Sequence, residues 1–169
     1  MVNIVLLEPE MPANTGNIGR TCVAAGARLH LIGPMGFRIN EKSLKRAGLD
    51  YWEHLDVTIY DCFEDFLKRN EDAVDKLYLA TTKAKHVYSQ IVYPKDCYIM
   101  FGKESAGIPE EILIDYEETC IRIPMCKAIR SLNLSNSAAI VLYEALRQQS
   151  FQQMELEGEL HLLEWRGER

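Results

Sequence analysis

Three segments of this sequence combine glycine with polar side chains that could bind an anion or position a reacting group. The first, residues 14–21, is Asn-Thr-Gly-Asn-Ile-Gly-Arg-Thr and follows an apolar run. Its place at the beginning of a predicted helix suits anion binding, because backbone N–H groups are unpaired there. It matches neither the dinucleotide-binding pattern nor the phosphate-binding loop that ends in Gly-Lys-Ser/Thr. A capped helix with an exposed arginine, Arg20, explains the pattern equally well.

The second and third segments also lie between an apolar run and a predicted helix. Residues 101–109 contain two glycines, Gly102 and Gly107, and one carboxylate, Glu104. Gly102 would let a ligand approach the backbone closely, and a tight turn before a capped helix is the alternative. Residues 123–136 contain four serine and asparagine residues within six positions. A single helix N-cap explains only one of these four.

Short apolar runs and helical patterns alternate along the chain and would position these segments. The runs predict strands at residues 2–7, 29–32, 57–60, 77–80, 98–101 and 119–123. Helices are predicted at about 15–25, 40–48 and 133–148. Two more are predicted to begin after the cap Asp61 and at Pro109, and residues 81–96 are predicted to be mostly loop. This alternation predicts a single α/β domain, residues 1–150, with a mostly parallel sheet flanked by helices. Residues 151–169 are predicted to form a tail or a short helix.

The composition argues against several classes of protein. Five cysteines are an odd number, and neither they nor the four histidines show metal-ligand spacing. We therefore predict no metal, no disulfide framework and a cytoplasmic location. No apolar run has the length of a membrane span, and the first residues do not resemble a signal peptide. The net charge of −6 argues against RNA as a partner unless a local basic surface binds it.

Together and in this order, the three segments resemble the motifs of the SPOUT superfamily of RNA methyltransferases. The resemblance is closest to the small tRNA 2′-O-methyltransferases that modify the wobble cytidine or uridine. It is found in residues 3–20, 31–37, 46–51, 101–109 and 123–136. It implies a deep trefoil knot in the C-terminal third, S-adenosyl-L-methionine as the cofactor, and a homodimer whose active site is shared between two chains. Apolar residues and Tyr143 on a wide stripe of the last helix favour a dimer independently.

The resemblance also assigns roles to individual residues. The cofactor is expected to bind, largely through backbone groups, at Leu79, Thr81, Gly102, Ile123, Met125, Ser131 and Leu132. The family assigns activation of the ribose hydroxyl to Arg20. A guanidinium stays protonated at neutral pH, so we favour a fixed cation that stabilises the developing alkoxide or binds the adjacent phosphate. The residues expected to position Arg20 or the ribose are Asn14, Glu104, Ser131 and Asn133.

The expected partner is the anticodon stem-loop of a tRNA, with leucine tRNA favoured. Two groups of basic residues are candidates for RNA binding: Lys42, Lys45 and Arg46, and also Lys127 and Arg130. A solvated helix face explains the first group equally well. Three alternatives stay open: a methyltransferase of the same superfamily that acts on another RNA, a catalytically silent cofactor-binding RNA scaffold, and a generic nucleotide-binding α/β module.

Overall fold

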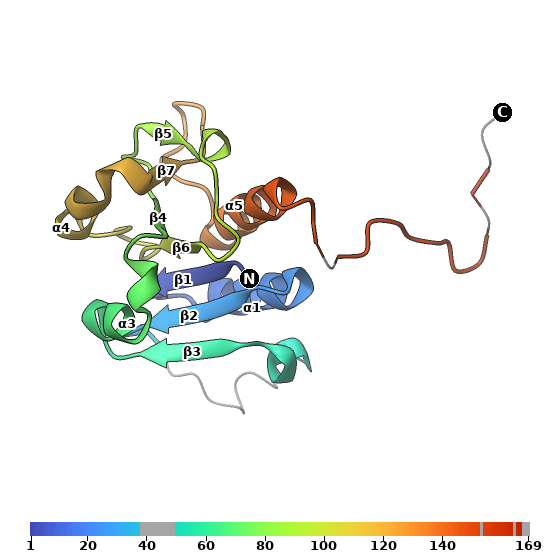
Figure 1. Ribbon diagram of the computed structural model, residues 1–169, viewed down its shortest axis with the longest axis horizontal. Helices are drawn as coiled ribbons and strands as arrows, with labels where there is room; N and C mark the ends of the chain where they lie inside the picture. Colours follow the sequence, from blue (N-terminus) through green and yellow to red (C-terminus); the bar gives the residue numbers. More distant parts are fainter. Residues whose placement is uncertain (38–49, 153, 164, 167–169) are drawn as a thin grey trace.

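The protein is built on one seven-stranded sheet with helices on both faces (Figure 1). The computed structural model describes residues 1–37, 50–152, 154–163 and 165–166. The strands are β1 (Asn3–Leu7), β2 (Arg28–Ile32), β3 (Val57–Tyr60), β4 (Leu77–Ala80), β5 (His86–Val87), β6 (Tyr98–Phe101) and β7 (Cys120–Arg122). Their order across the sheet is β3-β2-β1-β6-β4-β7-β5. Every pairing is parallel, which confirms the predicted α/β fold with a mostly parallel sheet.

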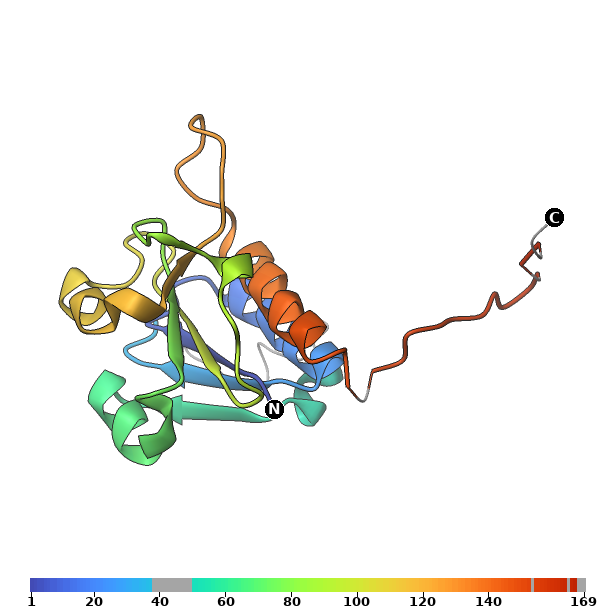
Figure 2. The ribbon, with the colours of Figure 1, turned by 45° about the horizontal axis from the view of Figure 1, so that its top comes forward.

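Two long helices cover one face of the sheet and shorter helices cover the other. The α-helices are α1 (Pro12–Ala25), α3 (Phe63–Arg69), α4 (Glu110–Leu113) and α5 (Leu134–Gln148). The 3-10 segments are η1 (Asp50–His54), η2 (Glu71–Ala73), η3 (Tyr88–Gln90) and η4 (Ile114–Thr119). Helices α1 and α5 lie side by side (Figure 2). Among the described residues, no helix has the length and hydropathy needed to cross a membrane.

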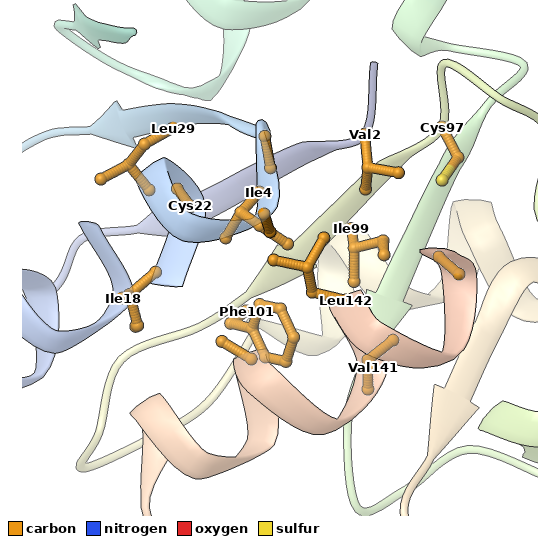
Figure 3. Packing of buried hydrophobic residues seen from close by; sticks show 14 of the residues in the cluster. Val2, Ile4, Ile18, Cys22, Leu29, Cys97, Ile99, Phe101, Val141 and Leu142 are labelled. Atoms are coloured by element: carbon orange, nitrogen blue, oxygen red, sulfur yellow. The ribbon is translucent and has the colours of Figure 1, made fainter. Parts of the chain in front are cut away.

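The core has two halves, one on each face of the sheet. In β1, Ile4 and Leu6 pack toward α1 and α5, and Val5 and Leu7 pack on the opposite face. Successive strand residues point to opposite faces, so a sheet covered on both faces requires continuous apolar runs. Figure 3 shows the first half, where side chains of α5 lie against those of β1 and β6.

The polar side chain of His30 is buried against Tyr60, Phe66 and Tyr98 of the second half of the core. His30 of β2 is hydrogen-bonded through Nδ1 to the Tyr60 hydroxyl (2.8 Å) and through Nε2 to Oδ1 of Asn3 (3.2 Å). Burial lowers the pKa of His30 to about 4. The ring is therefore neutral near pH 7, and the two hydrogen bonds satisfy both of its nitrogens.

Several element boundaries differ from the prediction. Helix α1 begins at Pro12 and not near Thr15, because proline fits the first helical turn, where its missing N–H is not needed. The N-cap of α3 is Cys62, with no side-chain cap, and not Asp61. The predicted loop 81–96 contains β5 and η3. The described residues of the tail form no helix, and the helix predicted at 40–48 lies outside the described residues.

Candidate functional site

A cavity of about 550 Å³ lies at the carboxyl ends of β4, β6 and β7. This is the edge at which open α/β sheets bind ligands. Two loops form much of its lining: residues 102–107, here called the glycine loop, and residues 123–133, here called the basic loop. The basic loop extends away from the body of the domain (Figure 2).

Six of the seven residues predicted to bind the cofactor line this single cavity. They are Thr81, Gly102, Ile123, Met125, Ser131 and Leu132. The seventh, Leu79 of β4, does not line the cavity, because its side chain is fully buried in the second half of the core. Segments that are 20 to 50 positions apart in the sequence therefore meet at one place.

The glycine loop is closed by its own backbone. The N–H of Gly107 donates to the carbonyl of Lys103 (2.8 Å), and Gly107 has φ +73°. A Cβ added at Gly102 would lie 2.1 Å from the carbonyl carbon of Gly107. The loop's own backbone therefore occupies the space of a side chain at position 102, while Gly102 also lines the cavity, and the approach of a ligand to it stays a prediction.

Glu104 connects the glycine loop to the beginning of α1. Its Oε2 accepts a hydrogen bond from the N–H of Glu10 (2.9 Å), and its Oε1 accepts from the N–H of Met11 (3.3 Å). Met11 is the N-cap of α1 and makes no side-chain cap of its own. A carboxylate at this position satisfies unpaired donors and interacts favourably with the helix dipole.

Asn14 joins Glu104 to the beginning of α5. Its Nδ2 donates to Oε1 of Glu104 (3.0 Å), and its Oδ1 accepts from Nδ2 of Asn133 (3.0 Å). Asn133 is the N-cap of α5, and its Oδ1 accepts from the N–H of Ser135 (2.9 Å). Three of the four residues predicted to position the reacting groups thus form one hydrogen-bonded chain. The fourth, Ser131, lines the cavity on the basic loop.

Arg20 is exposed on α1 and does not line the cavity of its own chain. Its guanidinium carbon lies 5.3 Å from the centre of the Tyr51 ring, within the range of a cation–π interaction. The Tyr51 hydroxyl donates to the carbonyl of Gly16 in the same helix. A Cβ at Gly19 would lie 3.1 Å from Leu55, so this glycine lets η1 pack closely on α1. The contact between Tyr51 and Arg20 was not predicted.

Basic residues surround the cavity, and two of them are paired. Lys103 is 2.5 Å from Glu8, and Lys83 is 2.7 Å from Glu110. The hydrogen bond to Glu8 raises the pKa of Lys103. On the basic loop, Arg130 lines the cavity, and Lys127 is exposed without lining it. The other predicted RNA-binding residues, Lys42, Lys45 and Arg46, lie outside the described residues.

The fold and the cavity define a class of protein. It is a parallel α/β protein with a cavity at the carboxyl ends of its strands, of a size usual for a small-molecule ligand. In the part of the chain that the structure describes, no three His, Cys, Asp or Glu residues gather in a way that could hold a metal ion.

The chain belongs to the SpoU rRNA Methylase family, whose model matches residues 1–143. It is 48% identical over 149 residues to the tRNA (cytidine(34)-2′-O)-methyltransferase of Escherichia coli (strain K12). The match covers 88% of this chain and 94% of that protein. The resemblance to small RNA methyltransferases that was drawn from the motifs is confirmed.

Solved structures share the fold. One, described as structural insights into the 2-OH methylation of C/U34 on tRNA, has a TM-score of 0.82 and 39% sequence identity, and the match covers 89% of this chain and 97% of that one. An AdoMet-bound rRNA methyltransferase from Sinorhizobium meliloti has a TM-score of 0.74 and 29% identity. The match covers 86% of this chain and 56% of that one.

Proposed function

We propose that this protein transfers a methyl group from S-adenosyl-L-methionine to the 2′-oxygen of the ribose at tRNA position 34. The observation that carries the proposal is the convergence of six predicted cofactor residues on one cavity beside the Glu104–Asn14–Asn133 chain. The E. coli relative is named for cytidine 34, and the solved structure for C/U34 on tRNA. We extend the substrate to uridine 34 and favour leucine tRNA.

The residues present fit this cofactor. A cavity of about 550 Å³ lies within the usual range for ligands of this size. Backbone groups at Thr81, at Gly102 and at Met125 of the basic loop would hold it, with further contacts from Ser131 and Leu132 of the same loop. The cofactor supplies an electrophilic methyl group when it is bound. We also propose that the C-terminal third forms a deep trefoil knot around this site, as the family resemblance implies.

The chain's own residues would align and polarise the ribose hydroxyl. Orientation supplies much of the reduction in barrier for such a displacement. Arg20 would stabilise the oxygen as its proton passes to solvent or to a phosphate oxygen, because a guanidinium is a permanent cation with a planar set of donors. Asn14 and Glu104 hold the beginning of the helix that bears Arg20.

We propose a homodimer in which Arg20 of one chain reaches the cavity of the other. Arg20 does not line its own cavity, so it would have to act on a second one. Ile140 and Tyr143 of α5 are 37% and 41% exposed and provide an apolar surface for the dimer. Lys127 and Arg130 would bind phosphates of the anticodon stem-loop.

The test is methyl transfer to total tRNA with purified protein and labelled S-adenosyl-L-methionine. Nuclease mapping should place the label on the ribose of nucleotide 34. Arg20→Ala should nearly abolish turnover and leave cofactor affinity unchanged. Arg20→Lys should also turn over slowly, because an ammonium lacks the planar set of donors of a guanidinium. Arg28→Ala, which removes an exposed arginine paired with Asp56, is the control. Label on a base, or on the ribose of a nucleotide outside the anticodon loop, would refute the proposed substrate.

A further inference from the structure

Residues 8–11, here called the N-terminal loop, and the glycine loop exchange hydrogen bonds in both directions. The N–H of Glu10 donates to Oε2 of Glu104 (2.9 Å). In return, the N–H of Ser105 donates to Oε2 of Glu10 (3.0 Å), and the Ser105 hydroxyl donates to Oε1 of Glu10 (2.9 Å). Each loop therefore supplies one carboxylate to the backbone of the other.

Three consecutive residues of the glycine loop each have a partner in the N-terminal loop. The Lys103 ammonium pairs with Glu8, Glu104 accepts from Met11, and Ser105 binds Glu10. The two hydrogen bonds from Ser105, together with the nearby charge of Lys103, lower the pKa of Glu10. Glu10 is thus a fixed, ionised acceptor near neutral pH, although its side chain is exposed.

We propose that Glu10 is a positioning residue for cofactor binding, which it supports by holding Ser105 and with it the glycine loop in the conformation that lines the cavity. This inference rests on the proposed function of the cavity. Lys103, Glu104 and Ser105 all line the cavity. If the loop had to become ordered when the ligand binds, the affinity for the ligand would be lower. Glu10 does not line the cavity and acts through Ser105.

The same contact also ties the cavity to α1. Glu10 directly precedes Met11, the N-cap of the helix on which Arg20 lies. Removing the Glu10 carboxylate leaves the Glu104 contacts to Glu10 N–H, Met11 N–H and Asn14 in place. The core is not exposed by this change, so a loss of binding without a loss of stability separates positioning from folding.

The experiment measures the affinity for S-adenosylhomocysteine by calorimetry, together with the melting temperature. Glu10→Ala should weaken binding about tenfold, since two hydrogen bonds of modest net strength are lost. Ser105→Ala should weaken it about threefold, since one is lost. Glu10→Gln should recover most of the affinity, because its amide oxygen can accept from the N–H and its amide nitrogen can donate to the hydroxyl. Glu117→Ala, which removes an exposed carboxylate paired with Lys85, is the control.

Two results would overturn the inference. One is unchanged affinity in Glu10→Ala, or a loss that is matched by a large drop in melting temperature. The other is a Glu10→Gln variant as weak as Glu10→Ala, which would show that charge and not the hydrogen-bonded pair matters. If the wild-type protein does not bind S-adenosylhomocysteine, the proposed function fails. Hydrogen exchange at the Ser105 amide, measured without ligand, then still tests whether Glu10 holds the loop, and unchanged protection in Glu10→Ala would reject that.

Discussion

The two loops that line the cavity are built differently. The glycine loop is closed by its own backbone and bound through three consecutive residues to the N-terminal loop. In the basic loop, the N–H of Ile129 makes a long hydrogen bond to the carbonyl of Cys126 (3.4 Å). Residues 126–133 are all exposed, including the apolar side chain of Ile129. One side of the cavity is thus fixed by the fold, and the other side is open to solvent.

This difference separates two kinds of contribution to binding. A loop that is already ordered binds a ligand without a further loss of conformational entropy. A loop with few internal contacts becomes ordered by what binds to it. We infer that the glycine loop contributes mainly to folding and to cofactor affinity. The basic loop, which carries Ile123, Met125, Ser131 and Leu132 of the predicted cofactor residues, would contact the cofactor and the RNA and have little effect on stability.

The largest expected effect is that of a methyl group at Gly102. In Gly102→Ala, the new Cβ would lie 2.1 Å from one backbone atom of Gly107 and 2.3 Å from another. Backbone atoms cannot move aside as the end of a flexible side chain can, so the loop must open. We expect a loss of about 3 kcal/mol or more in the free energy of unfolding, measured by urea denaturation.

The matched control for this change is Gly158→Ala. Nothing lies within 4 Å of a Cβ at Gly158, so the stability of the Gly158→Ala variant should equal that of the wild type. If Gly102→Ala unfolds at the same urea concentration as the control, the glycine loop is not closed in solution as it is in the structure. The contrast between the two loops would then be lost.

A smaller effect is expected from a new carboxylate beside Glu104. Asn14→Asp replaces the Nδ2 that donates to Glu104 with an oxygen 3.0 Å from another carboxylate oxygen. The change should lower the free energy of unfolding by about 2 kcal/mol at pH 8. Asn17→Asp, at an exposed position on the same helix, is the control and should be close to neutral.

The pH dependence identifies the cause of this loss. Two adjacent carboxylates share a proton, so the folded pair has a raised pKa, and the difference from wild type should shrink as the pH falls from 8 to 5.5. The stability of the wild type itself changes with pH in the opposite direction. Since the folded pKa of His30 is about 4, below the ordinary value of 6.5, folding stability is lost as the pH falls from 6.5 toward 4. A difference between variant and wild type that does not change with pH would rule out the shared proton.

Much of the fold could be predicted, because its determinants are local. The apolar runs of β1 and β6 and the cap at Asn133 are properties of a few neighbouring residues. Strand β5 is only two residues long, which is too short for any period to be detected. Helix α1 begins earlier than predicted, because the prediction treated Pro12 as part of the loop and not as the first helical residue.

The candidate site could be predicted only in part. Motif order pointed to residues that line the cavity, and three of the four predicted positioning residues, Asn14, Glu104 and Asn133, are hydrogen-bonded to one another. Nothing local marks Glu10 as a partner of Ser105, since the two are 95 positions apart in the sequence. The close approach of the Gly107 backbone to Gly102 was also not predicted, because the collision of a Cβ at position 102 with Gly107 depends on how the loop folds back on itself.

The smallest effect on stability is expected in the basic loop. Lys127 and Arg130 are exposed there, and removing exposed charges usually changes stability by less than about 0.5 kcal/mol. The double variant Lys127→Gln/Arg130→Gln should therefore melt within about 1 °C of the wild type. Its affinity for a tRNA anticodon stem-loop should fall. The slope of log affinity against log salt should become shallower by about 1.5, since each lost phosphate contact removes about 0.7 to 0.9 from it.

Lys95→Gln provides the control for this last comparison. Lys95 is exposed just before β6 begins, at the opposite end of the sheet from the cavity. It should leave both the melting temperature and the salt slope unchanged, although it alters the net charge by one unit. Filter binding at several salt concentrations separates a local contact from a general effect of charge. A salt slope in the double variant equal to that of the wild type would show that the basic loop does not bind RNA phosphates. A melting temperature lowered by several degrees would show that the loop is part of the folded core, and the contrast with the glycine loop would then fail.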